Sequence, residues 1–196
     1  TAQASPTPSP TRTATAAPTT TPLPPLIVVD PGHGGIDLGA RHFDASGHMD
    51  FHESEVNLDL ALRVRDLLLT RGYRVLLTRD GDYRLFDERD VNGDGEVTHI
   101  DEVQARIDLA NEAGADLLLS IHQNAYERAD GGYAGDVGGT VVYYCADRPF
   151  AERSALLAGL VHAHILEAFD DLGHDVRDRG VWDDAILQEP GEPGKH

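Results

Sequence analysis

Two histidines and one glutamate, His33, His122 and Glu53, lie at the ends of apolar runs or at the start of a helical pattern. His33 follows an apolar run, and His122 follows a second one later in the chain. Glu53 stands at the start of a helical pattern. Two imidazoles and one carboxylate around an open fourth position form a common catalytic zinc set. Zinc held in this way lowers the pKa of its bound water to about 7 and polarises a carbonyl, which is chemistry suited to amide hydrolysis.

The elements around these residues alternate between strands and helices. Short apolar runs bounded by turn residues predict strands at residues 26–30, 73–78, 117–121 and 140–145. Apolar residues at helical spacing predict helices at residues 55–71, 103–113 and 151–169. This alternation predicts an α/β fold with a mostly parallel or mixed sheet and helices on both faces. Ligands of such sheets bind beyond the carboxyl ends of the strands, where His33 and His122 fall.

Six short sequence runs carry a family resemblance. They are V-D-P-G-H-G-G from Val29, E-x-x-x-N-L from Glu53, G-Y-x-V-x-x-T-R-D from Gly72, A-N-x-x-x-A-D from Ala110, S-I-H-x-N-A from Ser120, and Arg179-Gly180-Val181. In this order they resemble the zinc-dependent N-acetylmuramoyl-L-alanine amidases of bacterial cell walls, the Amidase_3 domain, over about residues 26–188. The resemblance implies that His33, Glu53 and His122 are the zinc ligands. It also implies cleavage of the bond between N-acetylmuramic acid and the L-alanine of the stem peptide.

Several neighbours of the three ligands leave alternatives open. Glu55 competes with Glu53, but the family pattern places the ligand four residues before the Asn of N-L, which selects Glu53. His48 and His52 lie close enough in sequence to replace or contact that ligand. Asn124, two residues after His122, is a candidate for substrate binding, and a turn-forming asparagine is an equally good interpretation.

The general base of the family is not assigned to any residue of this chain. In the family it is a glutamate on a late strand, about twenty residues after the Arg-Gly pair, which here corresponds to a position beyond His196. Glu189 and Glu192 come earlier, among Pro and Gly residues, and are interpreted as loop residues. We therefore expect the fold to lack its last strand, and we expect the chain to be inactive or weakly active as it stands.

Residues 90–101 read as a calcium loop inserted into the domain. The pattern D-x-N-x-D-G-x-V-x-x-x-D places oxygen ligands at positions 1, 3, 5, 7, 9 and 12, with glycine at position 6 and an apolar residue at position 8. It resembles an EF-hand loop, and more closely the dockerin version that ends in Asp. The proposed calcium ligands are Asp90, Asn92, Asp94, Glu96 and Asp101. The alternative is an acidic turn without a metal.

Composition divides the chain into two parts. Residues 1–25 consist mostly of Thr, Pro, Ala and Ser, which predicts a disordered linker, and residues 26–196 form the amidase-like domain. The net charge of −18 argues against a nucleic-acid partner. Cys145 is the single cysteine, which excludes an internal disulfide and a thiolate zinc site. No segment predicts a membrane span, and we expect a monomer that is secreted, periplasmic or associated with the cell wall.

Three functional hypotheses follow. The first is a zinc hydrolase of the autolysin type that cleaves the muramoyl–alanine amide of peptidoglycan. The second is a non-catalytic, zinc-containing module that binds peptidoglycan. The third is a calcium-dependent interaction module, which the single calcium loop supports weakly because a dockerin has two such repeats. The expected cofactors are Zn²⁺ and, through the inserted loop, Ca²⁺.

Overall fold

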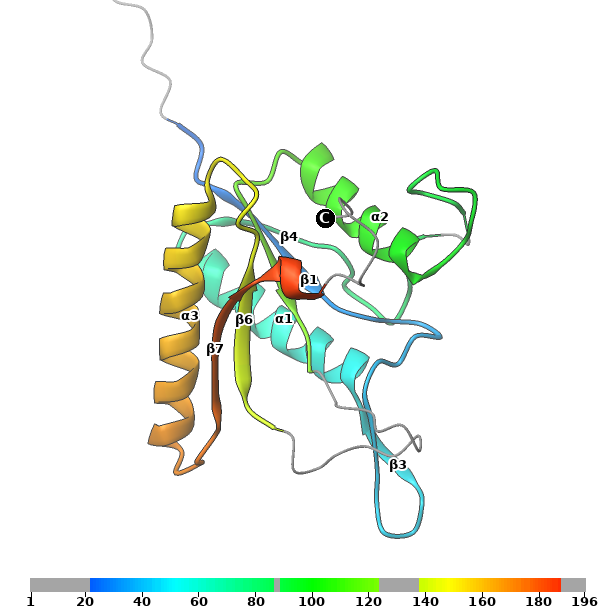
Figure 1. Cartoon of the computed structure of the whole chain (residues 1–196), viewed down its shortest axis with the longest axis vertical. Helices are drawn as coiled ribbons and strands as arrows, with labels where there is room; N and C mark the ends of the chain where they lie inside the picture. The colour runs from blue at the N-terminus through cyan, green and yellow to red at the C-terminus, as the bar shows by residue number, and fades with distance from the viewer. Residues whose placement is uncertain (1–21, 87–88, 124–137, 188–196) are drawn as a thin grey trace, which may run out of the picture. The chain divides into compact units, whose positions relative to one another are not determined.

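The computed structural model describes residues 22–86, 89–123 and 138–187, and it divides into two compact units. The first unit comprises residues 1–38 and 54–122, and the second comprises residues 39–53 and 123–196. Figure 1 labels several elements of each unit. The boundary between Glu53 and Ser54 falls inside one continuous helix, so Glu53 is the first residue of a helix that otherwise belongs to the first unit.

The first unit contains a three-stranded parallel sheet with its most buried strand in the centre. Its elements are β1 (Leu26–Pro31), α1 (Glu53–Thr70), β4 (Arg74–Leu77), α2 (His99–Glu112) and β5 (Leu117–Ile121). The strand order is β4-β1-β5. All six residues of β1 are buried, which explains why its sequence is continuously apolar instead of alternating.

Helices cover both faces of this sheet (Figure 1). On one face, Ile27 and Val29 of β1 pack with Ala61 of α1 in the hydrophobic core. The apolar residues packed around them are Val64, Leu68, Val75, Leu77, Leu117 and Ile121. Successive side chains of a strand point to opposite faces, so Asp30 lies on the other face, where it pairs with Arg106 of α2. The expected α/β fold with parallel strands flanked by helices is confirmed.

Helix α2 begins earlier than its apolar pattern predicts. The pattern indicated a start near residue 103, whereas the helix begins at His99. Thr98 is the N-cap, and its side chain and that of Asp101 form a reciprocal capping box. Capping satisfies amide groups that the first turn would otherwise leave unpaired, so it extends the helix into a polar segment.

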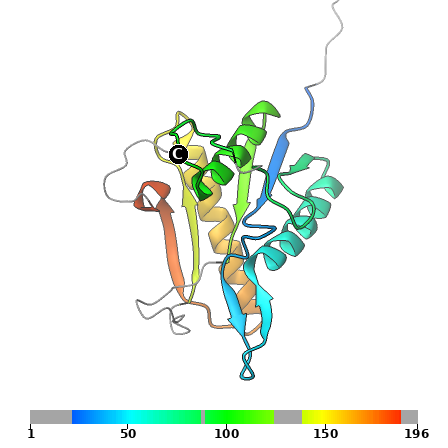
Figure 2. The same ribbon diagram turned by 90° about the vertical axis from the view of Figure 1, so that its right-hand side faces the viewer.

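The second unit contains two further pairs of strands. Its elements are β2 (Arg41–Phe43), β3 (Met49–His52), β6 (Thr140–Tyr144), α3 (Ala151–Asp171), β7 (Asp178–Asp183) and a 3₁₀ turn (Asp184–Leu187). Strands β6 and β7 are parallel and joined through α3, whereas β2 and β3 form an antiparallel hairpin (Figure 2). The sequence analysis did not predict β7 or the hairpin, because these strands are short and largely exposed and have few apolar residues.

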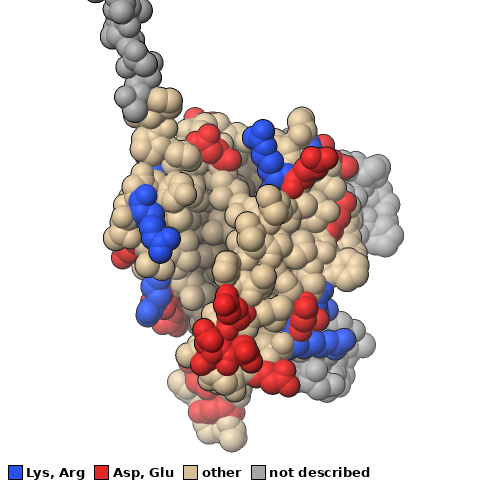
Figure 3. All heavy atoms as spheres, turned by 90° about the vertical axis from the view of Figure 1, so that its left-hand side faces the viewer, with Lys and Arg blue, Asp and Glu red and all other residues tan. Residues whose placement is uncertain are grey.

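Acidic side chains dominate the charge of the chain, which has 34 Asp and Glu against 16 Lys and Arg. They gather in patches on the face drawn in Figure 3. None of the described helices combines the length and the apolar composition that crossing a bilayer requires.

Candidate metal centre

His33, Glu53 and His122 come together at one place. Each offers one ligand atom, and these atoms lie within 4.8 Å of one another. His33 follows β1, His122 follows β5, and Glu53 is the first residue of α1. The two imidazoles meet edge to face, with ring centroids 4.9 Å apart and planes at 77°. Within residues 22–86, 89–123 and 138–187, this is the one group of three or more His, Cys, Asp or Glu side chains that converges in this way.

The loop that carries His33 has a left-handed backbone. The φ angle is +63° at His33, +135° at Gly34 and +59° at Gly35. Glycine adopts such angles without steric cost, but at His33 the same conformation costs on the order of 1–3 kcal/mol. Contacts elsewhere must therefore hold His33 in place.

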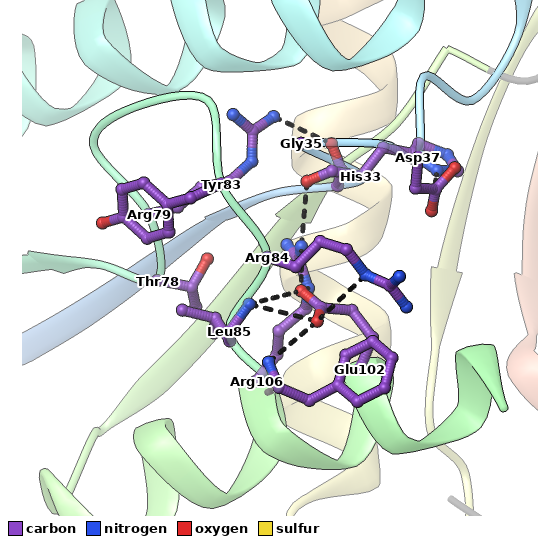
Figure 4. A network of polar contacts seen from close by, with 12 residues as sticks. His33, Gly35, Asp37, Thr78, Arg79, Tyr83, Arg84, Leu85, Glu102 and Arg106 are labelled. Carbon is purple, nitrogen blue, oxygen red and sulfur yellow. Dashed lines mark hydrogen bonds and ion pairs between the residues drawn. The ribbon is translucent and has the colours of Figure 1, made fainter. Parts of the chain in front are cut away.

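Two buried arginines supply these contacts, as Figure 4 shows in part. Arg79 donates from Nε to the Pro31 carbonyl (2.9 Å) and from Nη2 to the Gly32 carbonyl (3.0 Å). Arg106 donates from Nη1 to the Pro31 carbonyl (2.7 Å) and from Nη2 to the His33 carbonyl (2.9 Å). Burial, and second the positive charge of Arg106, lower the pKa of Arg79 from its ordinary value. Three consecutive carbonyls of the loop are thus bound by guanidinium groups.

Buried carboxylates balance the charge of Arg106. Its guanidinium lies 2.6 Å from Asp30 and 2.7 Å from Glu102. The Asp30 carboxylate also accepts hydrogen bonds from the hydroxyls of Thr78 (2.6 Å) and Ser120 (2.7 Å). Through Asp30, therefore, the end of β1 is tied to α2, to β5 and to the residue that follows β4.

A glycine allows His122 to approach the His33 loop. A Cβ atom at Gly32 would overlap the ring of His122. The Gly32 N–H donates to the Ile121 carbonyl at 3.0 Å, and its carbonyl accepts from the Asn57 side chain at 3.2 Å. The hydrogen bond to Ile121 joins the loop after β1 to the end of β5, and this brings the two histidines together.

Glu53 is almost completely buried, with 2% of its surface exposed. One carboxylate oxygen accepts the N–H of Ala40 at 2.9 Å, and the other accepts the N–H of Gln123 at 2.7 Å. An ionised carboxylate is an acceptor-only group with about four lone-pair sites, and carboxylate oxygens are ordinary ligands of zinc. The competing residue Glu55 is exposed and is not part of the cluster.

Other predicted site residues are not brought to this place or lie outside the described residues. Asn124, the candidate for substrate binding, is outside them, as are Glu189 and Glu192. His48 is exposed in the turn between β2 and β3, and His52 ends β3 directly before Glu53. Neither histidine is among the three residues of the cluster.

The predicted calcium loop, called the acidic loop below (residues 90–101), is folded around its own carboxylates. Asp90 accepts the N–H groups of Gly93 (2.6 Å) and Gly95 (2.8 Å). The buried Asp101 accepts those of Thr98 (2.6 Å) and Val91 (2.7 Å). The hydrogen bond from Thr98 is the largest influence that lowers the pKa of Asp101, and those from the N–H groups of residues 92 and 91 act in the same direction.

The remaining proposed calcium ligands lie in the exposed part of the acidic loop. The side chain of Asn92 accepts the N–H of Asp94 at 2.9 Å, and that of Asp94 accepts the N–H of Glu96 at 2.9 Å. Asp94 and Glu96 are exposed.

Sequence reasoning did not assign a role to the residues that hold the His33 loop. Arg79 and Arg106 lie within or beside the quoted runs, but the sequence alone did not show that both reach the same loop. One signal in the sequence could have indicated buried polar contacts at this place. It is the charged residue Asp30 at the end of the apolar strand β1. Asp37 was also missed, and its Oδ2 lies 2.9 Å from Nδ1 of His33.

The chain matches a family model described as N-acetylmuramoyl-L-alanine amidase, Amidase_3, over residues 27–189. Among curated relatives, the germination-specific N-acetylmuramoyl-L-alanine amidase of Bacillus subtilis is 37% identical over 100 residues, covering 51% of this chain and 39% of the relative. N-acetylmuramoyl-L-alanine amidase AmiA of Escherichia coli is 35% identical over 103 residues, which cover 52% of this chain and 28% of the relative. The chain thus spans well under half the length of these relatives.

Solved structures of similar proteins have the same fold. The CwlD amidase of Clostridioides difficile, in complex with the GerS lipoprotein, aligns with a TM-score of 0.62 and 26% identity over 86% of this chain and 78% of that chain. N-acetylmuramoyl-L-alanine amidase AmiC2 of Nostoc punctiforme aligns with a TM-score of 0.55 and 31% identity over 81% of this chain and 68% of that chain. With the family match covering most of its length, this chain belongs to the Amidase_3 family of N-acetylmuramoyl-L-alanine amidases.

Proposed function

We propose that this chain is a zinc-dependent hydrolase that cleaves the amide bond between N-acetylmuramic acid and L-alanine in peptidoglycan. The observation that carries the proposal is the convergence of His33, Glu53 and His122 within 4.8 Å in a chain of this family. The names of the relatives support the substrate class, because those proteins are amidases of the same bond.

The donor set fits zinc. Two imidazoles and one carboxylate are typical ligands of catalytic zinc, at metal–ligand distances of about 2.0–2.2 Å. Tetrahedral geometry at that distance separates neighbouring ligand atoms by about 3.4 Å, so atoms now within 4.8 Å need only small side-chain adjustments to bind one ion. A bound zinc ion would supply Lewis acidity, which activates water and polarises the scissile carbonyl.

The residues of the chain would prepare this site without a metal. Arg79 and Arg106 fix the backbone of the His33 loop, and Gly32 leaves the space that His122 occupies. The buried carboxylate of Glu53 is oriented by two backbone amides. Such preorganisation lowers the cost of ordering ligands when an ion binds.

The first experiment measures zinc content and hydrolysis by the same purified protein. After loading with about one equivalent of zinc and dialysis against metal-free buffer, the wild type should retain about one zinc per chain, and His122→Ala should lose it. His164→Ala is the matched control, since His164 is exposed on α3 and pairs with Glu167. Hydrolysis is followed as new free L-alanine amino groups released from purified peptidoglycan.

The outcomes separate the two leading functions. Zinc retention together with release of alanine amino groups supports the hydrolase. Zinc retention and sedimentation with peptidoglycan, without release, supports the alternative of a non-catalytic zinc-containing binding module. A folded wild type that retains no zinc contradicts both functions.

Asn124 is proposed as a substrate-binding residue. Its position two residues after His122 supports this role, because alternate residues of an extended segment point the same way. In an active protein, Asn124→Ala should raise KM more than it lowers kcat. The control is Asn111→Ala, which alters an exposed residue at the end of α2. An unchanged KM in Asn124→Ala would assign Asn124 to the turn instead.

The acidic loop is proposed to bind calcium through Asp90, Asn92, Asp94, Glu96 and Asp101. The spacing of its oxygen ligands, with Gly95 at position 6, supports the proposal. An ion that binds only the folded state at 100 times its Kd stabilises that state by about 2.7 kcal/mol. Calcium should therefore raise the melting temperature.

The calcium test compares variants of two turns. The rise in melting temperature with calcium should disappear in Asp94→Ala, which alters an exposed ligand of the acidic loop. It should persist in Asp44→Asn, because Asp44 forms similar backbone hydrogen bonds in the β2–β3 turn, outside the loop. A melting temperature of the wild type that does not respond to calcium contradicts the proposal.

Residues 1–25 are proposed to be a flexible linker next to a single amidase domain, residues 26–196, with the acidic loop as an insertion. The proposed protein is a secreted or wall-associated monomer. Limited proteolysis should remove residues 1–25 first and leave the domain intact. Light scattering should give the mass of one chain, and a larger mass contradicts the monomer.

A further inference from the structure

The imidazole of His33 has a carboxylate partner on the same loop. Its Nδ1 atom lies 2.9 Å from Oδ2 of Asp37. Asp37 is held there by two backbone hydrogen bonds with Gly34. The Gly34 N–H donates to the Asp37 carbonyl at 2.8 Å, and the Asp37 N–H donates to the Gly34 carbonyl at 3.1 Å. This bridge closes the loop on itself and fixes the carboxylate relative to the imidazole.

The pairing determines which nitrogen of His33 carries the proton. A neutral imidazole has one N–H, and an ionised carboxylate can only accept a hydrogen bond. The contact with Asp37 therefore places the proton on Nδ1 and makes Nε2 the unprotonated nitrogen. Only an unprotonated nitrogen can donate its lone pair to a metal ion.

We propose that Asp37 is a positioning residue that selects the tautomer and the ring orientation in which His33 binds metal through Nε2. This inference rests on the proposed zinc site. Ligating histidines commonly donate their second N–H to a carboxylate, and loss of such a partner costs about 10–100-fold in metal affinity. Asp37 acts on the side chain of His33, whereas the two arginines bind backbone carbonyls of the same loop.

The partial exposure of the His33–Asp37 contact allows a role in metal binding to be distinguished from a role in folding stability. The side chains of His33 and Asp37 are 23% and 43% exposed, so their contact is partly solvated, and a single hydrogen bond that water can replace contributes modestly to folding. Removal of the carboxylate should thus change metal affinity and leave the stability of the metal-free protein nearly unaffected.

A second His–Asp pair provides a matched control. Nδ1 of His42 lies 2.6 Å from Oδ1 of Asp50 across the β2–β3 hairpin. Its side chains are also exposed, at 59% and 43%, and neither residue belongs to the metal cluster. Asp50→Ala removes the same kind of contact without touching His33.

The experiment uses the metal-free chain with ¹⁵N-labelled histidine at about pH 8, where an ordinary imidazole is neutral. Long-range ¹H–¹⁵N spectra should show the His33 proton on Nδ1 in the wild type and a shift toward Nε2–H in Asp37→Ala. Zinc affinity, measured by competition with a chromophoric chelator, should fall about 10–100-fold in Asp37→Ala. Asp37→Asn keeps an acceptor oxygen and should recover part of the loss, and Asp50→Ala should match the wild type.

The outcomes distinguish this inference from the proposed function. If the wild type binds no zinc, the proposed zinc site is wrong, and the spectra still decide whether Asp37 sets the tautomer. If the wild type binds zinc and Asp37→Ala binds it equally well, the positioning role of Asp37 is overturned. A loss of affinity while the His33 proton remains on Nδ1 overturns it as well.

Discussion

The His33 loop and the acidic loop are held by opposite means. In the His33 loop, residues 31–35, backbone carbonyls are bound by two buried arginines from distant parts of the chain. In the acidic loop, backbone N–H groups are bound by carboxylates of the loop itself. One loop depends on the core behind it, whereas the other depends mainly on its own residues.

The difference shows how a loop can present a ligand rigidly. The arginines bind the backbone carbonyls of the His33 loop and so fix its backbone. The side chain of His33 is therefore held close to Glu53 and His122. In the acidic loop the carboxylates that would bind an ion already accept backbone hydrogen bonds. We therefore expect substitutions behind the first loop to be costly and substitutions within the second to have modest effects.

The largest effect is expected from Arg106→Met. This change leaves the carboxylates of Asp30 and Glu102 buried without their cation, and breaking a buried ion pair in this way costs about 3–5 kcal/mol. The free energy of unfolding from urea titration measures the loss. Arg63→Met is the control, because its pair with Asp59 is exposed and should contribute little to stability. Equal losses in the two variants would mean that the buried network does not hold the loop.

A smaller effect is expected from Gly32→Ala. The added methyl group would overlap the ring of His122, and overpacking of this kind costs about 1–3 kcal/mol. Displacement of His122 should also weaken zinc binding. Gly159→Ala is the control, since Gly159 lies inside α3 with open space around it. There alanine should stabilise the helix by about 0.5–1 kcal/mol, so the two glycine substitutions should change the unfolding free energy in opposite directions.

Thr98→Ala should cost about 1 kcal/mol, because it removes the N-cap of α2 at the end of the acidic loop. Thr98→Ser keeps the hydroxyl and should restore most of the stability in the same urea titration. If serine gives no recovery, the capping box does not contribute as the structure indicates.

The smallest expected effect is a loss of stability as the pH falls into the acid range. Hydrogen bonds from Thr98 and other backbone amides lower the pKa of Asp101 in the folded state below its ordinary value near 3.8. A depressed folded pKa gives stability that is present above the unfolded pKa and is lost as pH falls through the folded pKa. The advantage of the wild type over Asp101→Asn should therefore be full at pH 7 and shrink below about pH 4. Urea titrations in EDTA at several pH values measure it, and an advantage independent of pH would contradict the assignment.

Much of the first unit could be predicted from the sequence, because strong apolar patterns mark its elements. The continuous run of β1 and the periodicity of α1 gave nearly correct boundaries. The short runs around His33 and His122 placed both residues at strand ends, where the structure has them. Strand β7 and the β2–β3 hairpin were missed, since their residues are only weakly buried. Strand β7 also pairs with β6, which lies about 35 residues earlier in the chain.

The hydrogen bonds that hold the backbone of the His33 loop could not be predicted for a different reason. Hydrogen bonds from Arg79 and Arg106 to the same loop join residues 47 to 75 positions apart. Local pattern indicates that a charged residue is near a strand end, but it does not indicate which carbonyl that residue reaches. The contact between His33 and Asp37 spans only four positions, and it depends on the left-handed backbone between them, which sequence spacing does not reveal.

The carboxylate of Asp30 bears on which ion the proposed site would hold. Because it joins β1 to α2, β5 and the residue after β4, the fold itself brings His33 and His122, which follow β1 and β5, to the same end of the sheet. A preformed site of nitrogen and oxygen ligands follows the Irving–Williams order, in which copper binds more strongly than zinc. The fold would then give little selectivity among divalent ions, and the supply of each metal where the protein works would decide which one it carries.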